Sequence, residues 1–392
     1  MGTMNNHYCK SPWMSLFVYD DGKVKSCCAG QWDWGDLKEK SLDEIINDPK
    51  VIQLKQDILD GVPNSYCDYC TGCEANSGHS QRTYFHKFEV PEEKLNDTTS
   101  FDLMMTDIRW NNLCNLNCAY CDTLWSTSWQ KLKGYPIKSI KSRYYDSVIE
   151  KVKTNKDNME AIIMGGGEPL LHKQNVDLLQ SLNDNIHIDI MTNLSMDLNN
   201  SSVYQELTKK TDVNWCVSFE NIGDEFEFVR HGAKWEQLLI NLNVIKTNPG
   251  HQFMFKPTYN LLCATRIDKL YELSEQLDIP IFWQTLIHPA QLCVASMPKS
   301  VIQKCINHLT EFMQSERWSR YQDNHPSQPD LNFFDSVIKE LQDKINDSNH
   351  DTTDIVATFR RWVTEYENKY ATDVKKFNEL WPEFTELTGD TK

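Results

Sequence analysis

Short apolar segments alternate with helical segments through the middle of the chain. Six apolar segments are expected to be strands: residues 106–111, 161–165, 187–192, 214–219, 252–257 and 281–285. Helices are expected near residues 143–152, 176–183, 203–210, 235–247 and 267–276. Strands that alternate with helices favour an α/β fold, with a parallel sheet and crossover helices.

The N-terminal part shows a shorter pattern. Apolar residues of segment 16–24 alternate around Asp21-Gly22, which predicts a β-hairpin with a tight turn. Such a hairpin would hold Cys9 and Cys27 near one another across two strands.

Beyond about Met297 the pattern changes to charged, helical sequence with spaced aromatic residues. Aromatic residues between Phe359 and Trp381 recur at i, i+3, i+4 spacing, which indicates core packing rather than substrate stacking. We therefore expect three parts, residues 1–100, 101–296 and 297–392, the last of them a helical region that caps the rest.

One cysteine run carries the clearest chemistry. Cys114, Cys118 and Cys121 stand in a short segment just after the expected strand 106–111. Three thiolates at this spacing suit three corners of a four-iron cluster, because soft sulfur ligands favour iron–sulfur chemistry. The fourth iron is then open to a small molecule. A structural zinc site is the alternative, but it needs four ligands in two pairs.

A glycine run follows another expected strand. Gly165, Gly166 and Gly167 stand at the C-terminal end of the strand and precede Glu168. Glycines let the backbone approach a ligand closely, because no Cβ is in the way. Taken alone, such a run is more often a turn.

Together these residues resemble the radical SAM superfamily. The cysteine run matches its CX3CXΦC signature, with Tyr120 in the aromatic position, and the glycine run matches its GGE segment. The resemblance implies a partial (β/α)6 TIM-like barrel and a 4Fe–4S cluster on the three cysteines. It also implies S-adenosyl-L-methionine as cofactor, with Tyr120 in contact with it, its amino group at the glycine run and Glu168 beside that group.

Loops at the C-terminal ends of barrel strands converge on one mouth, so residues there are candidates for ligand binding. Four are expected to contact the cofactor: Asn193, Ser218, Glu220 and Arg230. In twitch-containing relatives a similar serine, acidic residue and arginine follow the fourth strand, and the resemblance implies that Ser218 or Arg230 reaches the carboxylate or ribose. A helix-terminal ion pair remains the alternative for Arg230, and a turn or cap role remains the alternative for Asn193.

A second set of cysteines lies upstream. Cys9, Gly22 and Cys27 form the pattern CX12GX4C, and Cys67 and Cys70 form a CX2C pair. The two pairs supply four thiolates, enough to ligate one further cluster completely. A zinc ribbon remains the alternative for this set.

This arrangement resembles the SPASM/twitch extension of radical SAM enzymes. Here it precedes the radical SAM core, whereas the familiar examples carry it at the C-terminus. The resemblance implies an auxiliary 4Fe–4S cluster within residues 1–100, held by the four cysteines of the two pairs. Adjacent strand residues point to opposite faces, so we expect Cys28 outside the ligand set, together with Cys73.

Charge and composition narrow the class of protein. The 392 residues carry a net charge of −16, and a field of that sign repels phosphate backbones, so nucleic acid is not an expected partner. No apolar stretch approaches the about 20 residues that span a bilayer, and the N-terminus lacks the apolar region of a signal peptide. We expect a cytoplasmic protein without membrane partners, whose 13 cysteines serve metal ligation rather than disulfides.

These expectations describe an enzyme that reductively cleaves S-adenosylmethionine to a 5′-deoxyadenosyl radical, which then abstracts hydrogen from a substrate. An electron donor such as flavodoxin or ferredoxin is expected. A fully ligated second cluster favours electron acceptance, and hence net oxidation or cross-linking of a peptide side chain, as in the maturation of ribosomally made peptides. Dehydrogenation of a sugar or aminocyclitol-like small molecule remains an alternative, as does a non-catalytic iron–sulfur or zinc scaffold.

Overall fold

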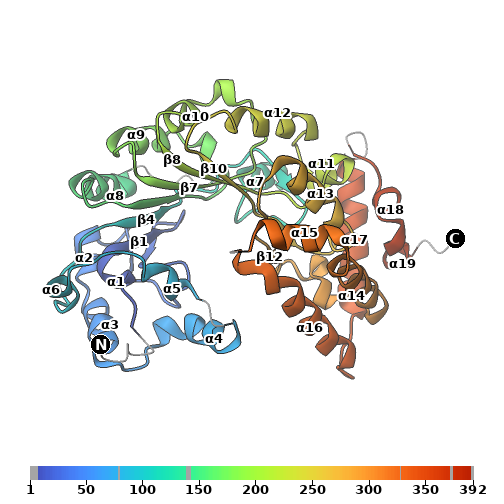
Figure 1. Cartoon of the computed structure of the whole chain (residues 1–392), viewed down its shortest axis with the longest axis horizontal. Coiled ribbons are helices and arrows are strands. Elements are labelled where there is room, and N and C mark those ends of the chain that lie inside the picture. The colour runs from blue at the N-terminus through green and yellow to red at the C-terminus, as the bar shows by residue number, and fades with distance from the viewer. Residues whose placement is uncertain (1–7, 78–79, 138–142, 327, 371–373, 390–392) are drawn as a thin grey trace.

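The centre of the molecule is an eight-stranded sheet in the order β10-β8-β7-β6-β4-β1-β2-β3 (Figure 1). The computed structural model describes residues 8–77, 80–137, 143–326, 328–370 and 374–389. Neighbouring strands from β10 to β1 are parallel, and β2 and β3 continue the sheet antiparallel. The strands are β1 Ser15–Val18, β2 Lys23–Lys25, β3 Gly35–Asp36, β4 Met105–Ile108, β6 Ala161–Met164, β7 His187–Thr192, β8 Asp212–Val217 and β10 Gln252–Phe255.

Five of the six predicted strands form the parallel part of this sheet, as β4, β6, β7, β8 and β10. Burial alternates along β7, where Ile188 and Ile190 are fully buried and Asp189 is only partly buried. A strand places successive side chains on opposite faces, so the apolar side chains face the helices and the polar ones face the concave side.

The sixth predicted strand, 281–285, departs from the main sheet. Ile281 makes a single bridge to Phe255, and β12 (Gln284–Thr285) then pairs with β11 (Thr258–Tyr259) in a separate two-stranded sheet. The sheet therefore curves at this edge without closing. The prediction of an α/β partial barrel is confirmed.

The predicted crossover helices are also present, and they cover one face of the sheet (Figure 1). They are α8 Arg143–Thr154, α9 Gln174–Ser181, α10 Ser202–Leu207, α12 Trp235–Ile245 and α13 Ile267–Leu277.

The N-terminal residues extend the same sheet. The predicted hairpin is confirmed: β1 and β2 pair antiparallel, with Gly22 in the turn at φ +89°. Parallel pairing of β1 with β4 sets Phe17 opposite Asp107. Helices α3 (Pro49–Asp60), α4 (Asp68–Ser77) and α5 (Gln81–Phe85) lie on the other side of this strand pair from the crossover helices (Figure 1). The boundary at residue 100 remains a prediction.

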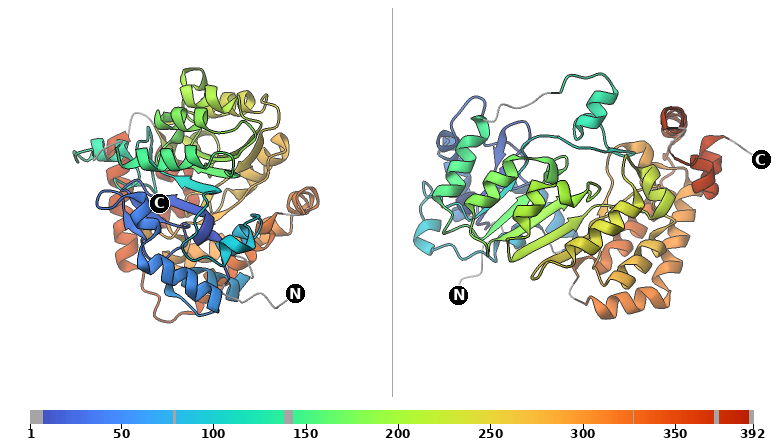
Figure 2. Two further views of the ribbon diagram at one scale, coloured as in Figure 1. Left: turned by 90° about the vertical axis from the view of Figure 1, so that its left-hand side faces the viewer. Right: turned by 90° about the horizontal axis from the view of Figure 1, so that it is seen from above.

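The C-terminal region is helical, as predicted, and it lies at the opposite end of the sheet from the N-terminal residues (Figure 2). Its main helices are α14 Lys299–Met313, α15 Glu316–Asn324, α16 Phe333–Asn346 and α17 Thr353–Tyr370. Phe359 and Trp381 are fully buried, which confirms the packing role. The Tyr366 hydroxyl donates to the carbonyl of Phe228 at 2.6 Å, which ties α17 to the barrel. Among the described residues, no helix is both long and apolar enough to cross a membrane.

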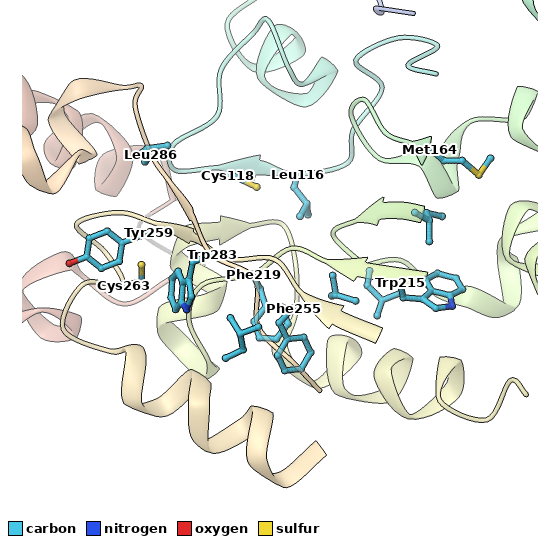
Figure 3. Close-up of a cluster of buried hydrophobic side chains, with 14 of the residues drawn as sticks. Leu116, Cys118, Met164, Trp215, Phe219, Phe255, Tyr259, Cys263, Trp283 and Leu286 are labelled. Atoms are coloured by element: carbon cyan, nitrogen blue, oxygen red, sulfur yellow. The ribbon is translucent and has the colours of Figure 1, made fainter. Parts of the chain in front are cut away.

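Buried aromatic side chains fill the space under the curved edge of the sheet. Figure 3 shows Phe219 and Phe255 together in this core, with Trp283 beside them. Leu116 points from the cysteine-containing loop toward the strands (Figure 3). The loop is therefore anchored to the core by its own apolar residues.

Candidate functional site

The predicted cluster cysteines lie in the loop after β4, which is held against the segment that follows α11 (Gly223–Val229). Within the loop, β5 (Asn117–Cys118) pairs antiparallel with β9 (Arg230–His231), and Cys118 and Arg230 are register partners. These two residues are 112 positions apart in the sequence. Backbone pairing therefore brings two distant predicted site residues together.

The three thiols of this loop lie close enough to influence one another. Burial raises the pKa of Cys114 to about 12, and the nearby Cys118 adds to the effect. The pKa values of Cys118 and Cys121 are also raised, mainly by burial. Three thiolates here would be unstable without a compensating positive charge, which the iron ions of a cluster supply. The donor set fits a cluster with three cysteine ligands.

Two predicted cofactor residues donate hydrogen bonds to these sulfurs. Nδ2 of Asn193 lies 3.8 Å from Sγ of Cys114, and Nη1 of Arg230 lies 4.0 Å from Sγ of Cys118. Hydrogen bonds to cluster sulfurs are one of the means by which proteins set reduction potentials. Both residues are therefore placed to act on the cluster through its ligands.

Arg230 also forms a buried ion pair. Its Nη2 and Nε donate to the two carboxylate oxygens of Glu220 at 2.7 and 3.1 Å. The Tyr120 hydroxyl donates to the same carboxylate at 2.8 Å, and the guanidinium lies over the Tyr120 ring. The structure thus gathers Tyr120, Glu220 and Arg230, and it gives Arg230 the ion pair named as its alternative role. Contact of the three with the cofactor remains a prediction.

The glycine run packs directly against the cysteine loop. Gly166 and Gly167 have φ values of +79° and +53°. A Cβ on Gly167 would lie 2.2 Å from the carbonyl oxygen of Leu113, next to the first cysteine. The backbone N–H of Glu168 donates to that same carbonyl at 2.7 Å. Only glycine permits this approach, because both the conformation and the contact exclude a side chain.

Glu168 is fully buried and joins the ends of β6 and β7. Its carboxylate accepts from the Thr192 hydroxyl and the Asn193 N–H, each at 2.7 Å, and from the Leu170 N–H at 3.1 Å. Burial raises the pKa of Glu168 to about 7. Glu168 therefore positions the strand end that carries Asn193, while its contact with a cofactor ammonium remains a prediction.

Ser218 follows β8 and is half-buried. Its backbone N–H donates to the carbonyl of Thr192 at 2.9 Å, so it lies at the same strand ends as Glu168 and Asn193. Its predicted cofactor contact is not tested by these contacts.

His172 was not selected from the sequence, yet it supports the glycine run. Its Nε2 lies 3.1 Å from the carbonyl oxygen of Gly166, and it is almost completely buried. Burial lowers the pKa of His172 to about 4, so the ring is neutral and Nε2 donates. The only signal in the sequence is that His172 lies four residues after Glu168. A single histidine near a motif is often unrelated to it, so this signal alone does not select the residue.

The upstream cysteines gather at one enclosed pocket. Cys9, Cys27, Cys67 and Cys70 all line it, and neither Cys28 nor Cys73 does. Burial raises the pKa of Cys9, Cys27 and Cys67, and neighbouring cysteines contribute in each case. The pocket therefore presents four thiols whose thiolate forms would repel one another, which suits a cationic occupant. Their role as ligands remains a prediction.

The wall of this pocket contains a compact polar network. The Arg82 guanidinium forms an ion pair with the Glu74 carboxylate, and the Ser80 hydroxyl also bonds to Glu74. On the other side, Ser26 binds the Tyr66 hydroxyl through its N–H at 2.8 Å. These contacts fix α4 and α5 around the cysteines.

A single zinc ion and a four-iron cluster require different distances between the thiols that bind them. Zinc holds its sulfurs at about 2.3 Å, so a zinc site needs ligands that converge on one point. In the described part of the chain, no three His, Cys, Asp or Glu side chains converge in this way. The four thiols line one pocket, and whether an auxiliary cluster or zinc occupies it stays a prediction.

The pocket of the four cysteines borders the concave face of the sheet. A second small pocket is lined by Cys27 and Cys28 on one side and by Asp107 of β4 and Ile163 of β6 on the other. The strand register sets Asp107, Ile163, Asp189 and Asn214 in one row across four strands. The upstream cysteines therefore lie beside a row in which three of the four side chains, those of Asp107, Asp189 and Asn214, are polar.

Comparison with protein families gives two matches along the chain. Residues 108–252 match the family described as the radical SAM superfamily. Residues 9–74 match SPASM, described as an iron–sulfur cluster-binding domain. The two matches contain the two cysteine sets.

Individual relatives are distant. A 7-carboxy-7-deazaguanine synthase of Clostridium acetobutylicum is 35% identical over 89 residues, which are 22% of this chain and 36% of that protein. Streptococcus suis SuiB bound to S-adenosylmethionine aligns with a TM-score of 0.40 and 12% identity, over 67% of this chain and 63% of SuiB. The anSMEcpe protein with bound AdoMet aligns with a TM-score of 0.39 and 15% identity, over 53% and 59%. The chain thus spans about a third of the length of its curated relative.

Proposed function

Since the chain belongs to the radical SAM superfamily and carries a SPASM iron–sulfur cluster-binding domain, we propose that it uses S-adenosylmethionine to oxidise or cross-link a peptide side chain. A radical SAM domain implies one 4Fe–4S cluster and S-adenosylmethionine, and a SPASM domain implies auxiliary iron–sulfur binding. The observation that carries the proposal is the presence of two separate cysteine sets. One precedes β4 in the chain and lines its own pocket, and the other lies in the loop that follows β4.

Cys114, Cys118 and Cys121 hold the cluster that meets S-adenosylmethionine. A cluster held there would supply the one-electron reduction that cleaves S-adenosylmethionine. The protein orients the cofactor and excludes water from it. Support comes from the burial of the thiols and from the two hydrogen-bond donors at their sulfurs.

The strand ends after β6, β7 and β8 bind the cofactor. The glycine run brings its backbone directly against the cysteine loop at Leu113, and Glu168 holds Asn193 next to Cys114. Arg230 and Glu220 form a fixed, bidentate unit. Such preorganised groups lose little freedom when a ligand binds.

Cys9, Cys27, Cys67 and Cys70 would hold a fully ligated auxiliary cluster, which would take up one electron in the oxidation of the substrate. Its pocket borders the concave face through Cys27 and Asp107. The substrate occupies that face, between the two cysteine sets. Asp107, Asp189 and Asn214 offer polar groups there, beside the apolar Ile163, and such a mixed surface suits the backbone and side chains of a peptide.

Anaerobic reconstitution tests this function directly. The protein should bind about eight irons per chain, four at each site, and should form 5′-deoxyadenosine when it is reduced with dithionite in the presence of S-adenosylmethionine. Replacement of Cys114, Cys118 and Cys121 by Ala should remove about half of the iron and abolish that product. Bound zinc, or iron without cleavage, would instead indicate a non-catalytic scaffold.

A further inference from the structure

We propose that the pocket between β12 and the C-terminal helices anchors an extended segment of the peptide substrate, which pairs with the free edge of β12 and inserts an apolar side chain. The inference rests on the proposed function, from which it takes a peptide as the occupant. None of the residues that line the pocket belongs to the row from Asp107 to Asn214 on the concave face. The pocket therefore holds a different part of the peptide from the part that reacts.

The pocket has a volume of about 510 Å³ and lies between the segment that follows β12, helix α16 and the start of α17. This volume is within the range of about 300–1,000 Å³ that is typical of ligand sites. Three buried apolar side chains, those of Val294, Val337 and Leu341, form part of the wall. Ile287 also lines the pocket, and it is 90% exposed, more than any other large hydrophobic side chain of the described residues. An apolar side chain bound here would leave water and would cover Ile287 as well.

One polar group in the wall has no partner. Tyr259 is 2% exposed, and its hydroxyl makes no hydrogen bond to any described residue. In Figure 3 this hydroxyl points away from Phe219 and Phe255. A buried hydroxyl without a partner is unfavourable, and a ligand that supplies an acceptor removes this cost. Tyr259 therefore indicates an occupant with polar groups, such as the carbonyl oxygens of a peptide.

β12 offers backbone groups beside the pocket. On the side of β11, the N–H of Leu286 donates to the carbonyl of Tyr259 at 2.9 Å. The N–H of Gln284 donates on the same side, to the carbonyl of Pro257 at 3.1 Å. Successive residues of a strand direct their backbone groups to opposite edges, so those of Thr285 face the other edge. No described strand pairs with that edge, and both residues of β12 are exposed. Extended peptides add to edges of this kind, which favours a peptide over a compact small molecule.

The rim of the pocket carries both signs of charge. Glu340 and Lys344 stand four residues apart on α16 and line the pocket, and neither forms an ion pair with a described residue. Both charges are therefore available to a ligand. A peptide suits such a rim better than an uncharged ligand does, because its own polar and charged groups can pair with either side chain.

The pocket is joined to the candidate cofactor site through β11. The N–H of Thr258 donates to the Glu220 carboxylate at 3.3 Å. The same carboxylate accepts from Tyr120 and Arg230. Tyr259, which lines the pocket, is the next residue after Thr258. A peptide anchored at the pocket is therefore held near the residues that we expect to bind the cofactor.

The experiment uses the reconstituted protein and, as the probe, a phage-displayed library of random linear peptides. The peptides most enriched on the wild type are synthesised with a fluorophore, and their dissociation constants are measured by fluorescence anisotropy. Tyr259→Phe removes the unpartnered hydroxyl, and Thr285→Pro removes the N–H at the free edge. Thr285→Ala keeps that N–H and is the matched control.

We expect Tyr259→Phe and Thr285→Pro each to weaken binding about tenfold, as loss of one hydrogen bond in a buried site does. Thr285→Ala should bind like the wild type. Tyr259→Phe gives up no hydrogen bond within the protein, so it should fold normally even if Thr285→Pro does not. Bound peptide should also slow hydrogen exchange at the backbone N–H of Thr285.

Equal dissociation constants for the wild type and Tyr259→Phe, or a library from which no peptide is enriched, overturn the proposal. A dimer of the wild-type protein that Thr285→Pro dissociates, seen by analytical ultracentrifugation, overturns it as well, since a second copy then occupies the edge. Peptide binding does not require cleavage of S-adenosylmethionine. Binding at the pocket by a protein that forms no 5′-deoxyadenosine when it is reduced therefore contradicts the proposed function and supports the pocket.

Discussion

The guanidinium of Arg230 lies 4.0 Å from the sulfur of Cys118, and pairing of β5 with β9 holds the two residues in register. The same guanidinium is bound to the Glu220 carboxylate, which is completely buried. The cluster loop is therefore attached to the strand end of β8 through one arginine.

Arg230→Gln should destabilise the folded protein by about 3–5 kcal/mol, because it leaves the buried Glu220 carboxylate without its cation. Urea unfolding of the anaerobic protein, followed by circular dichroism, measures the loss. The double variant Glu220→Gln/Arg230→Gln should recover most of it, since both charges are then removed. A double variant less stable than Arg230→Gln would show that the pair is not the source of the effect.

Asn193→Ala should lower the reduction potential of the cluster on the cysteine loop, because Cys114 loses a hydrogen-bond donor at its sulfur. Potentiometric titration followed by electron paramagnetic resonance measures the potential. Asn200→Ala is the control, since Asn200 lies on the exposed turn after β7 and bonds to Asp197. Equal potentials in the wild type and Asn193→Ala would remove this role.

Gly167→Ala should lower cluster content and binding of S-adenosylmethionine, because the new Cβ would lie 2.2 Å from the Leu113 carbonyl oxygen and push the cysteine loop away. Iron analysis and equilibrium dialysis measure the two effects. Gly134→Ala is the matched control: Gly134 also has a positive φ, +71°, but nothing lies within 4 Å of its added Cβ. Similar behaviour of the two variants would mean that backbone strain alone is responsible.

Glu168 should make stability depend on pH. Burial raises its pKa to about 7, so the folded state holds a proton that the unfolded state releases near pH 4.5. Stability is greatest below that pH and falls by roughly 3 kcal/mol as pH rises to 7 and above. Urea unfolding of the cofactor-free protein at pH 4.5 and 7.5 tests this. Glu168→Gln should flatten the difference, and a difference that survives the substitution would assign it to other groups.

Glu168→Gln should also weaken binding of S-adenosylmethionine with cluster content intact, since the charge beside the expected ammonium is lost. The dissociation constant measures this, and an unchanged constant would leave Glu168 with its structural role only.

Replacement of Cys9 and Cys67 by Ala should remove about four irons and preserve cleavage of S-adenosylmethionine. Cys28→Ala and Cys73→Ala are the controls, because neither residue lines the pocket of the four cysteines. Loss of iron in either control would place that thiol in the ligand set and open a position on the auxiliary cluster.

Local patterns in the sequence were enough to predict most of the strands and helices and to locate the cysteine and glycine motifs. Residues 187–192 alternate in polarity over a strand length and form β7 with the same bounds. The turn residues Asp21-Gly22 predict a hairpin, and both of its strands lie within a few residues of the turn. The cysteine and glycine runs are equally local, so their spacing was enough for the resemblance to the family that the matches support.

Contacts between distant residues depended on the tertiary structure. Nothing near Arg230 in the sequence indicates that it faces Cys118, and nothing near His172 indicates that it binds the Gly166 carbonyl. The same holds for the hairpin of residues 15–25, whose first strand joins the barrel sheet at β4. The sequence determined which segments are strands, helices and ligand-bearing loops, because short-range periodicity and spacing encode them. Which of these lie side by side was decided by packing, because burial and strand pairing act between segments that are far apart along the chain.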